Sequence, residues 1–130
     1  MVKNNLLKLF SIDEDKATSN GKYPGIYVRG ECIRAWDDEK QRYKNDEFKD
    51  IRIEVFFQSL DREKILVSLP LTALSKKDLE ELNYRADNGE TIELHLENLI
   101  IGLYQKYKDV SLSAKADGVV VLNTDTNEFV

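Results

Sequence analysis

The order of its secondary structure elements is the strongest constraint that this sequence places on the fold. Five stretches have the alternation or the β-branched content of strands, and the one strongly helical stretch, residues 74–86, falls between the third and the fourth. The predicted strands cover residues 23–36, 48–60, 64–69, 92–104 and 111–123. This order, β-β-β-α-β-β, predicts an all-β domain, rich in strands and with one helix.

The predicted helix has defined ends and one apolar side. Ser75 is a good N-cap, and Asn88-Gly89 is a typical end of a helix. Leu74, Leu79 and Leu82 supply a stripe for burial. A helix after the third of five strands is the arrangement of the five-stranded OB-fold barrel, whose usual ligands are oligonucleotides and oligosaccharides.

The 130 residues divide into three parts in this interpretation. Residues 1–22 form an N-terminal arm and a flexible linker, residues 23–123 the OB-fold domain, and residues 124–130 a C-terminal tail. The arm has apolar residues at helical spacing, but an isolated helix this short is marginal in water. It either folds back on its own barrel or docks on a neighbouring subunit, which the long polar tether favours. The residues for such an oligomerisation contact are Leu6, Leu7, Leu9 and Phe10.

The net charge of -5 argues at first against a nucleic-acid ligand, because phosphate-binding surfaces are normally basic. The excess acid is concentrated, since residues 74–97 carry 3 basic and 7 acidic side chains. A surface elsewhere can therefore be neutral or locally basic. We find no signal peptide and no apolar run of membrane-spanning length, and we expect a soluble, cytoplasmic protein.

Catalysis finds little support in the sequence. His95 is the only histidine and alternates with Glu93 and Glu97, so an exposed strand residue is a simpler interpretation than a metal site. Cys32 stands alone, without a partner for a disulfide or a zinc site. Phosphate-binding glycine loops and nucleophile motifs are absent from the sequence. We therefore expect no enzyme activity, no metal and no cofactor.

Binding has better support, because aromatic and basic residues occur together where an OB barrel meets its ligand. The loop between the first two strands contributes Arg42, Tyr43 and Lys44, and the turn between the last two contributes Tyr104, Lys106, Tyr107 and Lys108. The outward faces of the first three strands add Tyr27, Arg29, Arg34, Trp36, Arg52, Phe56 and Lys64.

Several of these residues have a second interpretation. Trp36 and Phe56 are as well suited to the core as to the ligand face, because a bulge near Gly30 would change the face of everything after it. Tyr27 and Tyr104 can simply cover the outside of the barrel, and Arg52 can pair with a neighbouring acid.

The segments GIYVRGECIRAW, residues 48–60, the helix after the third strand and YQKYKDVSLSAKADGVVVLN together resemble OB-fold single-stranded DNA-binding proteins. They look most like the small, divergent kind carried by conjugative plasmids and phages of Gram-positive bacteria. The resemblance covers about residues 23–123 and rests on element order and loop character. It implies binding of single-stranded DNA without sequence specificity, no catalysis, and a role in replication, recombination or conjugative transfer.

Our leading hypothesis is a protein that coats single-stranded DNA by stacking and phosphate contacts, and assembles into an oligomer or filament through its N-terminal arm. The alternative is a protein-interaction module, in which the barrel or the arm docks on a partner protein. The sequence leaves open whether DNA or RNA is preferred, because stacking serves both.

Overall fold

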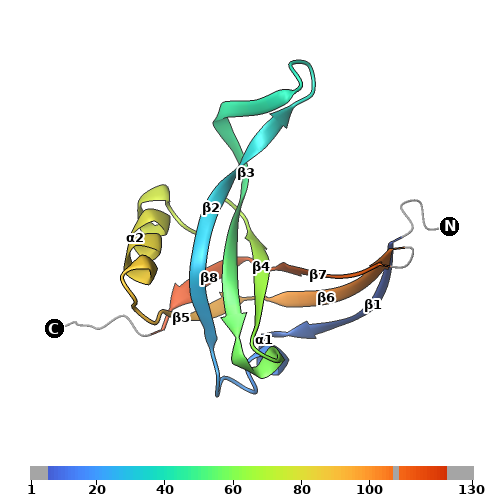
Figure 1. The fold of residues 1–130 in the computed structure, drawn as a ribbon, viewed down its shortest axis with the longest axis vertical. Coiled ribbons are helices and arrows are strands. Elements are labelled where there is room, and N and C mark those ends of the chain that lie inside the picture. Colours follow the sequence, from blue (N-terminus) through green and yellow to red (C-terminus); the bar gives the residue numbers. More distant parts are fainter. Residues whose placement is uncertain (1–5, 107–108, 123–130) are drawn as a thin grey trace.

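The computed structural model describes the backbone of residues 6–106 and 109–122, and the side chains of residues 11–44, 47–103 and 112–122. These residues form a β-rich fold, as the sequence predicts (Figure 1). Its strands are β1 (Leu6–Asp13), β2 (Gly25–Asp37), β3 (Arg42–Phe57), β4 (Glu63–Leu69), β5 (Glu93–Glu97), β6 (Ile100–Lys106), β7 (Asp109–Lys115) and β8 (Gly118–Val121). Its helices are α1 (Glu14–Ala17), the 3-10 turn η1 (Gln58–Leu60) and α2 (Lys76–Asp87).

The strands form one strongly curled sheet, a half-barrel, in the order β1-β6-β7-β4-β3-β2-β5-β8. Neighbouring strands are antiparallel except β4 and β7, which run parallel with Val67 opposite Ala114. The hairpin of β2 and β3 projects beyond the rest of the sheet, and β1, β6 and β7 extend to one side as a three-stranded wing (Figure 1).

Two of the five expected strands are each divided in two, and β1 is a further strand, so the described residues contain eight strands rather than five. The predicted strand 92–104 is divided into β5 and β6 at Asn98, which has the left-handed φ of 55°. The predicted strand 111–123 is divided into β7 and β8 close to Asp117. Asn98 Nδ2 donates to Asp117 Oδ2 over 2.9 Å, so a side-chain hydrogen bond ties the two corners together.

The N-terminal segment differs from the helical arm and flexible linker that we expect from the sequence. Leu6–Asp13 is strand β1, which pairs with β6 from Leu6 opposite Lys106 to Asp13 opposite Ile100. Residues 14–17 form α1, and Ala17 and Thr18 are buried. Pairing with β6 supplies the tertiary contacts that a short isolated helix lacks, and it overrides the helical spacing of the sequence.

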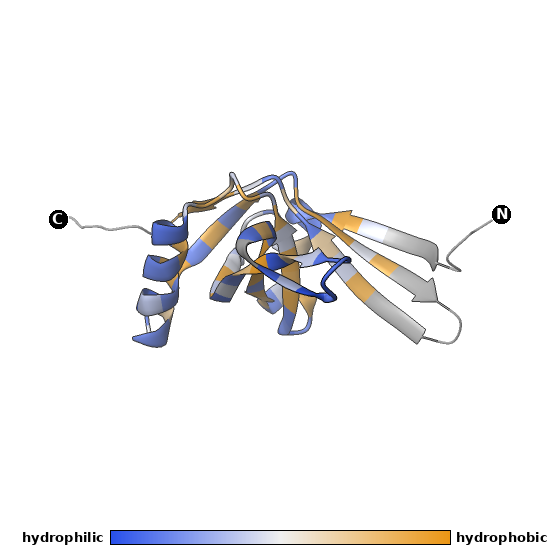
Figure 2. Ribbon diagram, turned by 90° about the horizontal axis from the view of Figure 1, so that it is seen from above, coloured by the Kyte–Doolittle hydropathy of each residue, from blue (hydrophilic) through white to orange (hydrophobic). Residues whose placement is uncertain are grey.

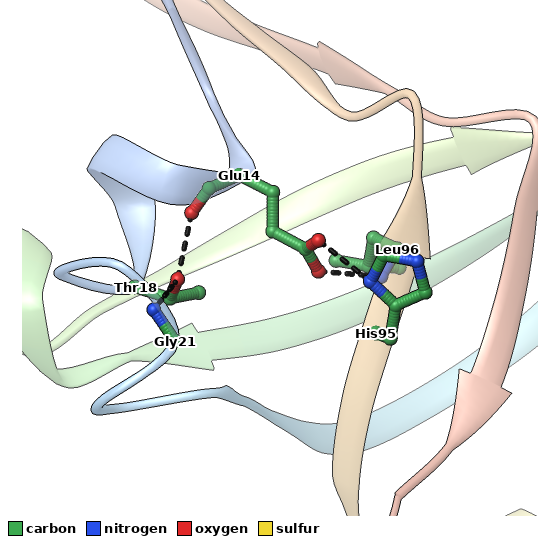
Figure 3. Close-up of polar contacts among 5 residues, drawn as sticks. All are labelled: Glu14, Thr18, Gly21, His95 and Leu96. Carbon is green, nitrogen blue, oxygen red and sulfur yellow. Dashed lines mark hydrogen bonds and ion pairs between the residues drawn. The ribbon is translucent and has the colours of Figure 1, made fainter.

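Glu14 ties α1 to β5 (Figure 3). Its Oε1 lies 2.6 Å from Nδ1 of His95, and its Oε2 accepts a 2.6 Å hydrogen bond from the backbone N–H of Leu96. The register of β2 on β5 includes only Leu94 and Glu93. Glu14 therefore supplies the acceptor that β2 does not provide at Leu96, and the same carboxylate is the partner of the His95 ring.

The core lies inside the curl of the sheet. Alternate residues of β3, Ile51, Ile53, Val55 and Phe57, are buried, which is the pattern of a strand with one face toward the core. Helix α2 begins after Ser75, whose side chain accepts from the Asp78 N–H over 3.0 Å, and buries Leu79 and Leu82. Its outer side is hydrophilic (Figure 2). The predicted cap and apolar stripe of this helix are both confirmed.

Within the described residues, none of the helices has the length and apolar character needed to cross a bilayer.

Candidate nucleic-acid interface

A groove of about 720 Å³ lies where helix α2 meets the hairpin of β2 and β3. Its lining comes from Gly30, Glu31, Cys32, Ile33 and Arg34 of β2, from Tyr43, Phe48 and Arg52 of β3, and from Lys76, Leu79, Glu80 and Asn83 of α2. Apolar and polar side chains both line it, as a ligand with flat rings and charged groups would need. Three of the predicted site residues, Arg34, Tyr43 and Arg52, meet here.

Asn83 fixes the wall that α2 contributes to this groove. Its Nδ2 donates to the carbonyl oxygen of Gly30 over 2.9 Å, and its Oδ1 accepts from the Gly30 N–H at the same distance. The hydroxyl of Tyr27 donates to the same Oδ1 over 2.6 Å. A Cβ at Gly30 would lie 2.7 Å from Ile53 Cγ2 and 2.9 Å from Leu79 Cδ1, so glycine permits the close approach of helix and strand.

The prediction that Tyr27 binds the ligand is therefore wrong. Only 3% of it is exposed, and it belongs to the hydrophobic core. A register shift between Tyr27 and Arg29 puts the tyrosine on the inner face while Arg29 stays exposed. Burial in this apolar setting raises the pKa of the Tyr27 phenol well above its usual value. The Tyr27 side chain therefore supports the groove from inside, through its hydrogen bond to Asn83.

An exposed aromatic pair lies next to the groove, near the end of the hairpin. Trp36 and Tyr43 face each other across β2 and β3, with ring centroids 4.9 Å apart and ring planes at 80°. Trp36 is 46% exposed and Tyr43 58%. Trp36 therefore lies at the surface and not in the core, and both rings keep surface that a ligand can cover.

Positive and negative side chains both line the groove. Arg34, Arg52 and Lys76 are the cations, and Glu31 and Glu80 are the acids. Because guanidinium groups offer several N–H donors, Arg34 and Arg52 suit the recognition of phosphate oxygens or base edges.

Arg52 is held only loosely. Its Nε lies 3.9 Å from Oδ1 of Asp50, and both atoms are buried without a hydrogen-bond partner among the described residues. The neighbouring acid that Arg52 approaches is thus Asp50, on its own strand.

The outer face of β2, β3 and β4 carries a second group of predicted residues. Phe56 is half-buried on the face of β3 opposite the core, beside Lys64 of β4, which is exposed. Arg29 lies opposite Glu54, and Glu54 lies opposite Leu66, which is 60% exposed. This face is continuous with the groove through β3, but the aromatic pair lies at the far end of the hairpin.

Two basic residues of the predicted hairpin loop do not line the groove. Arg42 is exposed and lies opposite Asp37 in the register of β2 and β3. Lys44 makes a surface ion pair with Glu47, with 3.1 Å between Nζ and Oε1. Such exposed pairs are weak, so Lys44 stays free to exchange its partner.

The remaining predicted residues cannot be placed in the same way. Tyr107 and Lys108 lie outside the described residues, and Tyr104 and Lys106 lie on β6 with side chains outside the description. The same holds for the side chains of the proposed oligomerisation residues Leu6, Leu7, Leu9 and Phe10, which are on β1. The roles predicted for these residues stay predictions.

Among the lining residues that sequence reasoning did not predict are Phe48, Lys76 and Asn83. Phe48 begins the predicted second strand, and a bulge brings it opposite Arg34. Lys76 and Asn83 lie on the helix for which we predicted only a cap, an end and a buried apolar stripe. Their contribution depends on where α2 docks on β2, for which the local sequence has no signal.

No protein-family model, curated protein or solved structure matches this chain.

Proposed function

We propose that this protein binds single-stranded DNA without sequence specificity and coats it during replication, recombination or conjugative transfer. The observation that carries the proposal is the exposed pair of Trp36 and Tyr43 beside a groove that contains Arg34 and Arg52. Aromatic faces stack on bases of any sequence, and cations follow the phosphates. As part of the proposal, the protein is cytoplasmic, has no catalytic role, needs no cofactor and self-associates through its N-terminal segment.

The strand pairing supports an OB-like barrel beneath this site. If the bent strands β5/β6 and β7/β8 each count as one, the ring runs β2, β3, β4, β7/β8, β5/β6 and back to β2. The parallel contact of β4 with β7 and the antiparallel contact of β2 with β5 would be its closing contacts. In an OB barrel of this order, the long hairpin of β2 and β3 flanks the ligand-binding face.

The proposed affinity comes mainly from stacking. Two stacked bases, one on Trp36 and one on Tyr43, contribute about 2–6 kcal/mol at ~1–3 kcal/mol each. Phosphate contacts of Arg34, Arg52 and Lys76 add a salt-dependent part. Because the net charge is -5 and two acids line the groove, we expect modest affinity and binding that is strongest at low salt.

The sole tryptophan makes the test direct. A labelled poly-thymidine oligonucleotide is titrated at low and moderate salt, with anisotropy of the label and fluorescence of Trp36 as parallel readouts. We expect binding that weakens with salt, exceeds binding to duplex DNA and quenches Trp36. Tyr43→Ala is expected to weaken binding about tenfold, the loss of about one stacked base.

Tyr84→Ala is the matched control, because Tyr84 is 70% exposed on α2 and does not line the groove. It should leave the titration unchanged. Absence of binding at low salt would reject the proposal and favour a protein-interaction module. Equal losses in Tyr43→Ala and Tyr84→Ala would place the ligand elsewhere.

A further inference from the structure

Strand β1 leaves one edge of the sheet open. It is the terminal strand in the sheet order, so its edge away from β6 has no neighbouring strand among the described residues. The strand is 8 residues long, LLKLFSID, without proline and with Lys8 as its only charge before Asp13. Proteins usually protect such edges with several charges, prolines, bulges or short strands; β1 has one lysine and one bulge, but it has no proline and is not short. The edge of β1 is thus suited to receive another strand.

The opposite end of the sheet is different, because α2 approaches β8. Val121 of β8 lines a small cavity together with Leu74 and Leu82. This edge strand is also only 4 residues long. The open template for a further strand is therefore β1.

We propose that β1 pairs with β1 of a second copy of this chain, antiparallel and about a two-fold axis. The register follows from a bulge in β1. Lys8 lies opposite Tyr104 and Phe10 opposite Leu103, so Leu9 is an extra residue in the ladder. When Leu9 is left out of the count, Lys8 lies two ladder positions before Ser11, and Asp13 lies two positions after it.

An antiparallel pair centred on Ser11 is complementary in charge. It sets Lys8 opposite Asp13 of the second copy, and the two-fold axis repeats this pair on the other side. Phe10 then lies opposite Ile12 of the second copy, and Ser11 lies opposite its own equivalent. Asp13 Oδ1 accepts the Lys16 N–H over 3.1 Å, and the carboxylate retains further acceptor capacity for a lysine.

The self-complementary pattern identifies the occupant as a second copy, because an unrelated strand would have to carry the same spacing of charges by chance. Such an interface is isologous and closes at two subunits. The proposed pairing therefore gives a closed dimer, whereas self-association through the N-terminal segment in general would also allow an open filament. The dimer does not depend on DNA binding.

The first experiment measures molar mass by light scattering over a range of concentrations. We expect a shift from 15.0 kDa toward about 30 kDa, twice that mass, as concentration rises. Lys8→Glu replaces both attractive pairs by repulsive ones and should raise the dimer dissociation constant about tenfold. Lys77→Glu makes the same charge change at an exposed position on α2 and should have no effect.

The second experiment tests the register through Ser11, with Cys32→Ser to remove the native thiol. Opposite residues of antiparallel strands have Cα atoms about 4.5–5.5 Å apart, within the range of a disulfide. Ser11→Cys should therefore form a covalent dimer under mild oxidation much faster than Thr72→Cys, which places the thiol in an exposed loop.

Three results would overturn the proposal. The first is a monomer at every soluble concentration, and the second is a species larger than a dimer. The third is a dimer that Lys8→Glu does not weaken and that Ser11→Cys does not cross-link faster than the control. The DNA titration is read separately, so its failure leaves this inference standing.

Discussion

Asn83→Ala should destabilise the protein more than any other truncation of a polar side chain on α2. The variant removes two hydrogen bonds to the Gly30 backbone and the one from the Tyr27 hydroxyl. Each such bond contributes about 0.5–1.5 kcal/mol net, and a partly buried peptide group left without partners adds to the loss. We expect the free energy of unfolding to fall by about 2–4 kcal/mol.

Urea unfolding followed by circular dichroism measures this loss. At a slope of about 1.5 kcal/mol/M, the midpoint should fall by about 1.3–2.7 M with the slope unchanged. Asn88→Ala is the matched control, because its amide donates one exposed hydrogen bond to the Tyr84 carbonyl, and we expect it to cost less than about 1 kcal/mol. Tyr27→Phe should cost about 1 kcal/mol, and much less when Asn83 is already alanine.

Equal midpoints for Asn83→Ala and Asn88→Ala would refute this reasoning, because Asn83 would then not hold α2 against β2. Additive effects of Tyr27→Phe and Asn83→Ala would show that the phenol and the amide do not act together. Since Asn83 also lines the groove, a folded Asn83→Ala variant should bind the oligonucleotide more weakly than the wild type.

Three further predictions follow from the same packing. Gly30→Ala should lower the free energy of unfolding by about 1–3 kcal/mol, because its Cβ would lie 2.7–2.9 Å from three neighbouring residues; a wild-type urea midpoint would contradict this. The pKa of the Tyr27 phenol is raised in the folded state, so the stability that this phenol contributes is complete below pH 10 and is lost as pH rises above it. The Tyr27→Phe variant should therefore lose less stability than the wild type between about pH 9 and pH 11. Parallel curves of unfolding free energy against pH would disprove this role of the phenol. Glu14→Ala should lower the free energy of unfolding by about 1–3 kcal/mol, because the Leu96 N–H loses its acceptor. Glu14→Gln keeps an amide oxygen as acceptor and should lower it less. Urea midpoints of the two variants measure the difference.

Local patterns in the sequence predicted the parts of the fold that local interactions decide. The alternation in β3 identified its buried face, and Ser75 identified the start of α2, because side-chain period and capping act over a few residues. The helical spacing near the N-terminus was misleading. There, pairing with β6 decides the structure, and its partner lies far away in the sequence.

In the candidate site, too, the sequence predicted what depends on local pattern and missed what depends on contacts between distant parts of the chain. Exposed aromatic residues in a charged hairpin were predictable, and Tyr43 lines the groove with Trp36 beside it. The burial of Tyr27 was not predictable, because a register shift directly after this residue changes which residues of β2 face the core. The contribution of Asn83 depends on a contact across 53 residues, which the sequence alone does not reveal.

The position of β1 also has a consequence for synthesis on the ribosome. Its partners on β6 lie 87 to 100 residues further along the chain, from Asp13 with Ile100 to Leu6 with Lys106. The apolar stretch LLKLF therefore leaves the exit tunnel early and waits, unpaired, until most of the chain has been made. During that interval its apolar side chains are open to chaperones that hold nascent chains, because its partner strand β6 has not yet been made.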